Sequence, residues 1–138
     1  MTDPVLHIDN LSMDFLTPRG PLHALRSVNL TVPKGEVVGV VGESGCGKST
    51  LISAVIRLLA ENAVVVEGKI LFEGESLLGL SKERMRRLRG DRISMVFQDP
   101  MQALNPSMRL GEQMKEVLTV HRGSIQLTGS SAGLVNVC

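Results

Sequence analysis

The stretch that decides the fold is "VVGVVGESGCGKST", residues 37–50. Its first part, 37–41, is rich in β-branched valine, which predicts a strand buried on both faces of a parallel sheet. Its second part, 42–49, fits G-x-x-x-x-G-K-[ST] at every fixed position. We call residues 42–49 the phosphate loop. Apolar residues then recur at helical spacing and predict a helix with a broad buried face. The residues of that face are Leu51, Ile52, Val55, Ile56, Leu58 and Leu59.

The residue types of the phosphate loop suit a nucleoside triphosphate. Glycine lets the backbone curl into an anion-binding nest, and the helix that follows adds unpaired N–H groups and its dipole. We assign Lys48 to the β- and γ-phosphates, the Ser49 hydroxyl to Mg²⁺, and Thr50 to the α-phosphate. ATP and Mg²⁺ are therefore the expected cofactors, and a glycine-rich turn without a ligand is the alternative. The residues predicted to bind ATP here are Gly42, Glu43, Ser44, Gly45, Cys46, Gly47, Lys48, Ser49 and Thr50.

Composition limits the remaining classes of function. The 138 residues allow one small domain, and 43% hydrophobic residues are enough for a core. A net charge of +1 gives no bulk electrostatic reason to expect nucleic acid as a partner. Cys46 and Cys138 cannot form a disulfide framework, which favours a reducing, cytoplasmic setting. No signal peptide is visible, and no apolar run approaches the roughly 20 residues of a membrane span, so no direct span is expected.

Alternation and turn residues predict the strands outside the phosphate loop. Two antiparallel strands are expected at 5–15 and 22–32, joined by a turn at 17–21. A third strand is expected at 68–74, and a fourth at 93–99, where "ISMVFQD" is apolar and ends in an acid.

Two further helices are expected. A polar one begins near Ser81 and breaks at Gly90, and a second occupies 109–121. The basic run 82–92 is interpreted as a solvated helix face, with a nucleic-acid or lipid patch as the alternative, because no aromatic residues interleave with the charges. The apolar stripe of the second helix is Leu110, Met114, Val117, Leu118 and His121.

Three strings resemble the ATP-binding subunits of ABC transporters, in the dipeptide, oligopeptide and nickel importer branch. They are "VGESGCGKST" (41–50), "GKILFEGESLLGLS" (68–81) and "RISMVFQDPMQALNP" (92–106), and the resemblance spans about residues 4–121. It implies an α/β P-loop NTPase fold of the ABC ATPase type, with an N-terminal antiparallel β subdomain and an incomplete RecA-like core. The full-length subunit would couple ATP hydrolysis to import of peptides or nickel.

The same resemblance implies roles for two residues outside the phosphate loop. Gln98 corresponds to the Q-loop glutamine, which contacts Mg²⁺ and the attacking water and leads to a helical subdomain. Phe15 lies where the family places an aromatic ring that stacks on adenine, although a core residue at a strand end is an equally good reading. The implied partners are transmembrane permease subunits and a second ATP-binding subunit. The implied location is cytoplasmic, on the inner face of the bacterial plasma membrane through the permeases.

The family pattern is not completed along the chain. We find no LSGGQ signature, no strand ending in Asp-Glu and no switch histidine. We therefore expect 1–122 to be the N-terminal part of a nucleotide-binding domain. Residues 123–138 are expected to be a disordered non-family tail produced by truncation or a shifted frame, with a divergent helical subdomain as the alternative. The family is an ATPase, but this chain alone is expected to be inactive.

Two other functions remain open from the residues alone. The first is a nucleotide-binding fragment without turnover. The second is a small, unrelated P-loop NTPase in which Asp99, at the end of the apolar run 93–99, holds Mg²⁺.

Overall fold

The structure of the chain is a computed structural model that describes residues 3–122. It divides the chain into two compact units, Met1–Arg89 and Gly90–Cys138, which are described separately. The first unit contains the sheet, the phosphate loop and two helices among its described residues, and the second contains two helices among its own.

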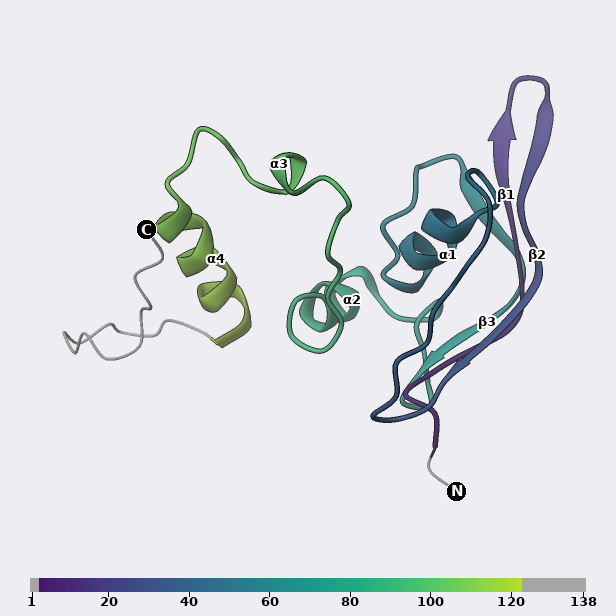
Figure 1. The fold of residues 1–138 in the computed structure, drawn as a ribbon, viewed down its shortest axis with the longest axis horizontal. Coiled ribbons are helices and arrows are strands. Elements are labelled where there is room, and N and C mark those ends of the chain that lie inside the picture. Colours follow the sequence, from purple (N-terminus) through teal and green to yellow (C-terminus); the bar gives the residue numbers. More distant parts are fainter. Residues whose placement is uncertain (1–2, 123–138) are drawn as a thin grey trace. The chain divides into compact units, whose positions relative to one another are not determined.

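The first unit is built around an antiparallel sheet (Figure 1). The strand order is β2-β1-β3-β4, so β1 pairs with both β2 and β3. The strands are β1 (Leu6–Thr17), β2 (Gly20–Val32), β3 (Ala63–Phe72) and β4 (Glu75–Ser76). Of the four strands predicted in this part of the chain, those at 5–15, 22–32 and 68–74 are confirmed, and β3 begins earlier than expected. Its additional residues, "AVVVE", are mostly β-branched and pair with the second half of β1.

A β-bulge in β1 places the core residues on one face. Ile8, Leu11 and Met13 are all completely buried, although Ile8 and Leu11 are three residues apart and would face opposite ways in a regular strand. The register shifts between Ile8 and Leu11, where Asn10 has a positive φ of 47°. The bulge is held by polar side chains, because the Asn10 N–H donates to Asn29 Oδ1 at 2.9 Å.

The start of both helices in the first unit was predicted correctly, but the end of one of them was not. α2 (Lys82–Leu88) begins as expected, with the Ser81 hydroxyl accepting a hydrogen bond from the Arg84 N–H at 3.2 Å. α1 (Lys48–Val55) starts at the predicted place but ends at Val55, so the predicted extension of its apolar face to Leu58 and Leu59 is wrong. The chain leaves the helix through Arg57, whose φ of 54° is left-handed.

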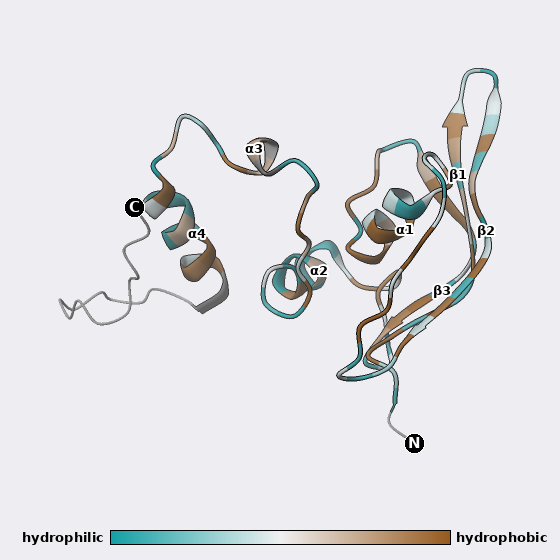
Figure 2. Ribbon diagram, in the orientation of Figure 1, coloured by the Kyte–Doolittle hydropathy of each residue, from teal (hydrophilic) through white to brown (hydrophobic). Residues whose placement is uncertain are grey.

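The valine run 37–41 does not form the predicted strand. Val37 and Val41 are 100% and 96% exposed, and the segment is an extended connection from β2 to α1 (Figure 2). A strand this apolar needs hydrogen-bonded neighbours on both sides. Among residues 3–122, every strand belongs to the antiparallel sheet, so no parallel neighbour is present in the described part of the chain.

The second unit contains α3 (Pro100–Ala103) and α4 (Leu110–Arg122) among its described residues. The predicted strand at 93–99 is wrong: its side chains include Val96, which is 95% exposed, and the segment is irregular. α4 confirms the predicted helix at 109–121. Its apolar stripe is exposed at Leu110, Met114, Val117 and Leu118, and the side chain of His121 is outside the described residues.

The tail prediction for 123–138 also lies outside the described residues. Within the described residues, no helix has both the length and the apolar character required to span a membrane.

Substitution of Gly68 should destabilise the sheet. Gly68 has a φ of 100° opposite the β1 bulge, and a Cβ there would lie 2.6 Å from the Leu11 Cα. We expect Gly68→Ala to lower the free energy of unfolding by about 3 kcal/mol, because backbone strain and overpacking add. Gly74→Ala is the control: its φ is 82° but nothing lies within 4 Å, so about 1 kcal/mol is expected. Urea unfolding followed by circular dichroism measures both, and equal losses would contradict the steric argument.

The exposed valines should cause self-association. An extended apolar segment with unpaired backbone groups is a template for pairing with another chain. We expect the chain to form oligomers in sedimentation velocity at micromolar concentration, and the double variant Val37→Lys/Val41→Lys to shift it toward monomer. Both positions are almost fully exposed, so the lysines disturb no packing. A wild-type chain that sediments as a monomer would show the prediction to be wrong.

Candidate nucleotide site

The phosphate loop ends where α1 begins. Gly47 is the N-cap, with φ 95° and ψ 5°, and its carbonyl accepts the first helical hydrogen bond from the Leu51 N–H at 2.9 Å. No side chain caps this end within the described residues, and the first turn carries no acidic residue. The N–H groups of a helix's first turn have no intrahelical acceptor, so this end of α1 is suited to an anion.

Gly47 also fixes the loop against the sheet. A Cβ at this position would lie 2.9 Å from both the Ala24 carbonyl oxygen and the Leu25 Cδ2 of β2. Only glycine therefore fits, both for the left-handed φ and for the close approach. Sequence reasoning did not identify Ala24 and Leu25 as part of the site, because the motif carries no signal for this long-range contact.

Lys48 is folded back over the loop. Its Nζ donates to the carbonyl oxygens of Gly42 and Glu43, each at 2.6 Å, and lies 3.3 Å from Cys46 Sγ. The Cys46 N–H donates to the Glu43 carbonyl at 3.3 Å and closes the loop around the ammonium. A Cβ at Gly42 would lie 2.6 Å from Cys46 Sγ, so a larger residue here requires the Cys46 side chain to move. All three N–H donors of the Lys48 ammonium are used in these contacts, so binding a phosphate requires the release of at least one of them.

The rest of the loop fits a bound nucleotide with its metal. Ser44, Gly45 and Ser49 are exposed, while Thr50 is half-buried. Gly45 has a φ of 79° with open space around its Cα, so the backbone can approach a ligand closely. The Ser49 hydroxyl, in the first turn of α1, is an oxygen ligand of the kind Mg²⁺ prefers. These residues fit the expected cofactors.

Phe15 belongs to the same unit as the loop. It lies near the end of β1, half-buried, opposite Leu22 of β2 and Ala63 of β3. Leu22 is two residues, or about 7 Å of strand, from Ala24, whose carbonyl lies against Gly47. The structure therefore places Phe15 in the neighbourhood of the loop, and its role toward adenine stays a prediction.

Gln98 and Asp99 belong to the second unit. Both are exposed, and Gln98 lies in a bend after Phe97, so its role toward Mg²⁺ and water stays a prediction. Asp99 is the N-cap of α3, where its Oδ1 accepts from the Met101 N–H at 3.0 Å. This capping role, together with the absence of a strand at 93–97, disfavours Asp99 as the metal ligand of a small self-contained NTPase.

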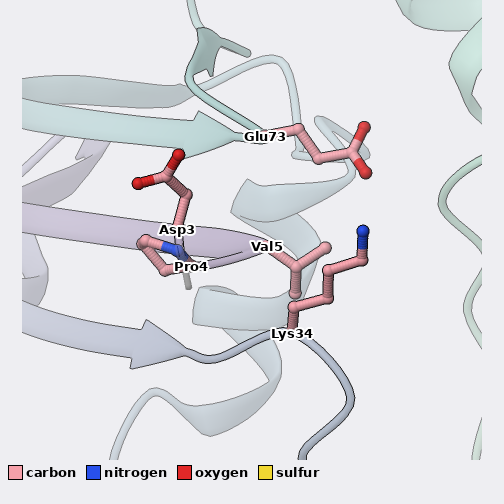
Figure 3. A pocket seen from close by; sticks show the side chains of 5 residues that line it. All are labelled: Asp3, Pro4, Val5, Lys34 and Glu73. Atoms are coloured by element: carbon pink, nitrogen blue, oxygen red, sulfur yellow. The ribbon is translucent and has the colours of Figure 1, made fainter. Parts of the chain in front are cut away.

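A cavity of about 370 Å³ lies elsewhere in the first unit, where β1 begins and β2 and β3 end. It is lined by Asp3, Pro4, Val5, Lys34 and Glu73. Figure 3 shows Glu73 and Lys34 extending to the same side while the Asp3 carboxylate points the other way. This cavity combines charges of both signs and includes no residue of the phosphate loop.

Comparison with known protein families gives a result that agrees with two features of this structure. They are the glycine-rich loop at a helix N-terminus and the antiparallel sheet. The chain belongs to the ABC transporter family, because the sequence model of that family matches residues 25–133. This assignment confirms the resemblance read from the sequence and excludes an unrelated NTPase. The fold is a partial ABC ATPase fold.

Among curated proteins, the chain is similar to the oligopeptide transport ATP-binding protein OppD of Haemophilus influenzae, with 46% identity over 121 residues. That match covers 88% of this chain and 37% of OppD. The dipeptide transport ATP-binding protein DppD of Lactococcus lactis is 44% identical over 119 residues, covering 86% of this chain and 34% of DppD. The chain thus spans about a third of the length of these relatives.

Among solved structures, the chain is similar to the dimeric structure of MJ0796, described as a bacterial ABC transporter cassette. The TM-score is 0.74 at 26% identity, over 87% of this chain and 50% of that cassette. An MJ0796 structure bound to ADP and Pi has a TM-score of 0.60 at 24% identity, over 82% and 54%, and supports the fold.

Cys46 offers a direct chemical test of the loop. It is a free, exposed cysteine whose Sγ lies beside Lys48 Nζ inside the loop. A bulky alkyl group and a triphosphate should compete for this space. We therefore expect Mg-ATP to slow alkylation of Cys46 by N-ethylmaleimide about ten-fold at concentrations near ten times the Kd. Quantitative mass spectrometry of the Cys46 peptide measures the rate, and Mg²⁺ without ATP is the control. Unchanged labelling would show that ATP does not occupy the loop.

Proposed function

We propose that this chain forms the ATP-binding part of an ABC importer subunit that powers uptake of peptides. The observation that carries the proposal is the phosphate loop itself, in which the Lys48 ammonium lies inside a glycine-rich loop at the open N-terminus of α1. Membership of the ABC transporter family supplies the context.

Each residue of the site has a proposed task. Lys48 moves from the loop carbonyls to the β- and γ-phosphates, and the N–H groups of 45–50 surround the phosphate oxygens. Ser49 holds Mg²⁺, which neutralises charge on the phosphates when it is bound. Phe15 stacks on adenine, since a π-face is sufficient for that contact. Gln98 contacts the metal and orients the attacking water through its amide.

The names of the relatives support peptides as the transported class. OppD and DppD are ATP-binding proteins for oligopeptide and dipeptide transport. The dimeric MJ0796 cassette supports a second ATP-binding subunit as a partner. Permease subunits would complete the transporter and hold this chain at the inner face of the membrane. Hydrolysis and transport belong to the whole protein in this proposal, and nucleotide binding belongs to the described residues.

A fragment that binds nucleotide without turnover is the second candidate. It is favoured by the location of every proposed phosphate contact within 42–50 of the first unit, whereas Gln98 belongs to the second unit. Equilibrium binding and steady-state hydrolysis, measured on the same preparation, separate binding from catalysis.

Lys48→Ala tests the proposed function. The substitution removes the only side-chain cation of the loop, and a hydrogen bond to a charged group contributes about 1.5–3 kcal/mol, so ATP affinity should fall about 10- to 100-fold. Circular dichroism should be unchanged, because within residues 3–122 the hydrogen bonds of the Lys48 ammonium all go to the loop itself. Lys69→Ala, an exposed lysine on β3, is the charge-matched control and should bind ATP normally. Fluorescence titration with a labelled ATP measures all three chains, and wild-type affinity in Lys48→Ala would refute the proposal.

A further inference from the structure

A second cavity in the first unit is lined mainly by basic side chains. Its volume is about 430 Å³, and it lies between the C-terminal end of α1 and α2. Arg57, Lys82, Arg86 and Arg89 contribute four positive charges, and Glu83 is the only carboxylate among the lining residues. No residue of the phosphate loop takes part.

Two of the lining arginines, Arg57 and Arg89, are held by hydrogen bonds to backbone carbonyls. Arg57 Nη1 donates to the carbonyl oxygens of Leu77 and Leu80, at 3.2 and 2.6 Å. Arg89 Nη1 donates to those of Ile56 and Arg57, at 3.2 and 3.4 Å. A guanidinium has five N–H donors, so each arginine keeps others for a ligand. Both charges are therefore held in place before any ligand arrives, which lowers the entropy cost of binding.

The other two cations come from one face of α2. Lys82 and Arg86 are four residues apart, which places them side by side on a helix. Glu83 Oε1 lies 3.6 Å from Arg86 Nη2 and 3.5 Å from Arg87 Nε. The single charge of Glu83 is therefore shared between two guanidinium groups. The cavity therefore keeps an excess of positive charge.

Size and lining define the class of ligand. The volume is within the range of about 300–1,000 Å³ for small-molecule sites, and it exceeds what one phosphate ion needs. Leu58, which is 50% exposed, adds apolar surface beside the charges. Arginine forks match phosphate oxygens in bidentate geometry. We propose that this cavity binds an organic phosphate ester, with the phosphate on the arginines and a small neutral body against Leu58.

The ester has two possible sources, a soluble metabolite or the headgroup of an acidic phospholipid. The sequence alone favoured a solvated helix face for the basic run 82–92. The fixed arginines and the cavity between α1 and α2 change that interpretation for Lys82, Arg86 and Arg89. They do not change it for Arg84, which pairs with Glu75 at 2.8 Å and does not line the cavity.

The test uses the 138-residue chain with Lys48→Ala, so that the phosphate loop does not contribute. One arm titrates glycerol 3-phosphate by NMR, and the other measures flotation with phosphatidylglycerol–phosphatidylcholine vesicles. In this background, Lys82→Gln/Arg86→Gln removes two cavity charges from exposed positions. Arg26→Gln/Arg84→Gln removes the same net charge from exposed positions outside the cavity. Circular dichroism checks that all chains are equally folded.

We expect the cavity pair to weaken binding about ten-fold or more and the control pair to leave it within about two-fold. If the cavity pair loses glycerol 3-phosphate binding, the ligand is a soluble ester. If the cavity pair loses vesicle flotation, the ligand is a lipid headgroup. Equal weakening by both pairs would overturn the proposal, since it would mean nonspecific attraction. The proposal would also be overturned if the Lys48→Ala chain bound neither glycerol 3-phosphate nor the vesicles. Neither result depends on whether ATP binds the phosphate loop.

Discussion

The contact between Gly47 and β2 is the constraint on which the site depends. The Ala24 carbonyl and the Leu25 side chain leave no room for a Cβ at Gly47, and this glycine is also the N-cap of α1. One residue therefore joins the antiparallel sheet, the end of the phosphate loop and the start of the helix. Because β2 also pairs with the half of β1 that carries Phe15, the same contact brings the candidate adenine residue into the region of the loop.

Local pattern predicted the parts of the fold that local contacts stabilise. The hairpin of β1 and β2, the start of α1, and α2 before the break at Gly90 all follow from alternation, turn residues and helical spacing. The valine run 37–41 and the run 93–97 carry equally strong strand patterns, yet both are irregular. Apolar character predicts that a segment should be buried, but it does not supply the hydrogen-bonded neighbours. The bulge at Asn10 was not predictable either, because its hydrogen bonds reach Asn29 of β2 and Glu67 of β3, which are 19 and 57 residues away in the sequence.

The site divides in the same way. Every proposed phosphate contact comes from the motif, because the motif is a continuous segment whose chemistry is local. The resting position of Lys48 on the Gly42 and Glu43 carbonyls was not predicted. It has a physical cause: an ammonium carries three N–H donors, and the loop's own carbonyls are acceptors within its reach. Binding of a triphosphate would therefore exchange neutral acceptors for charged ones. The gain in affinity is the difference between the two sets of hydrogen bonds and not the full strength of the new set.

The position of α1 depends on contacts at both ends of the helix. A helix of eight residues is too short to be stable by itself, since isolated helices need about 12–15 residues. Its N-terminus is fixed by Gly47 against β2, and its C-terminus by Arg89, which donates to the Ile56 and Arg57 carbonyls. A cation at the C-terminal carbonyls stabilises a helix through its dipole, as an anion does at the N-terminus. Arg89 of the basic cavity and a phosphate in the loop would therefore act on opposite ends of the same dipole. The placement of α1 thus depends on residues separated by more than sixty positions in the chain.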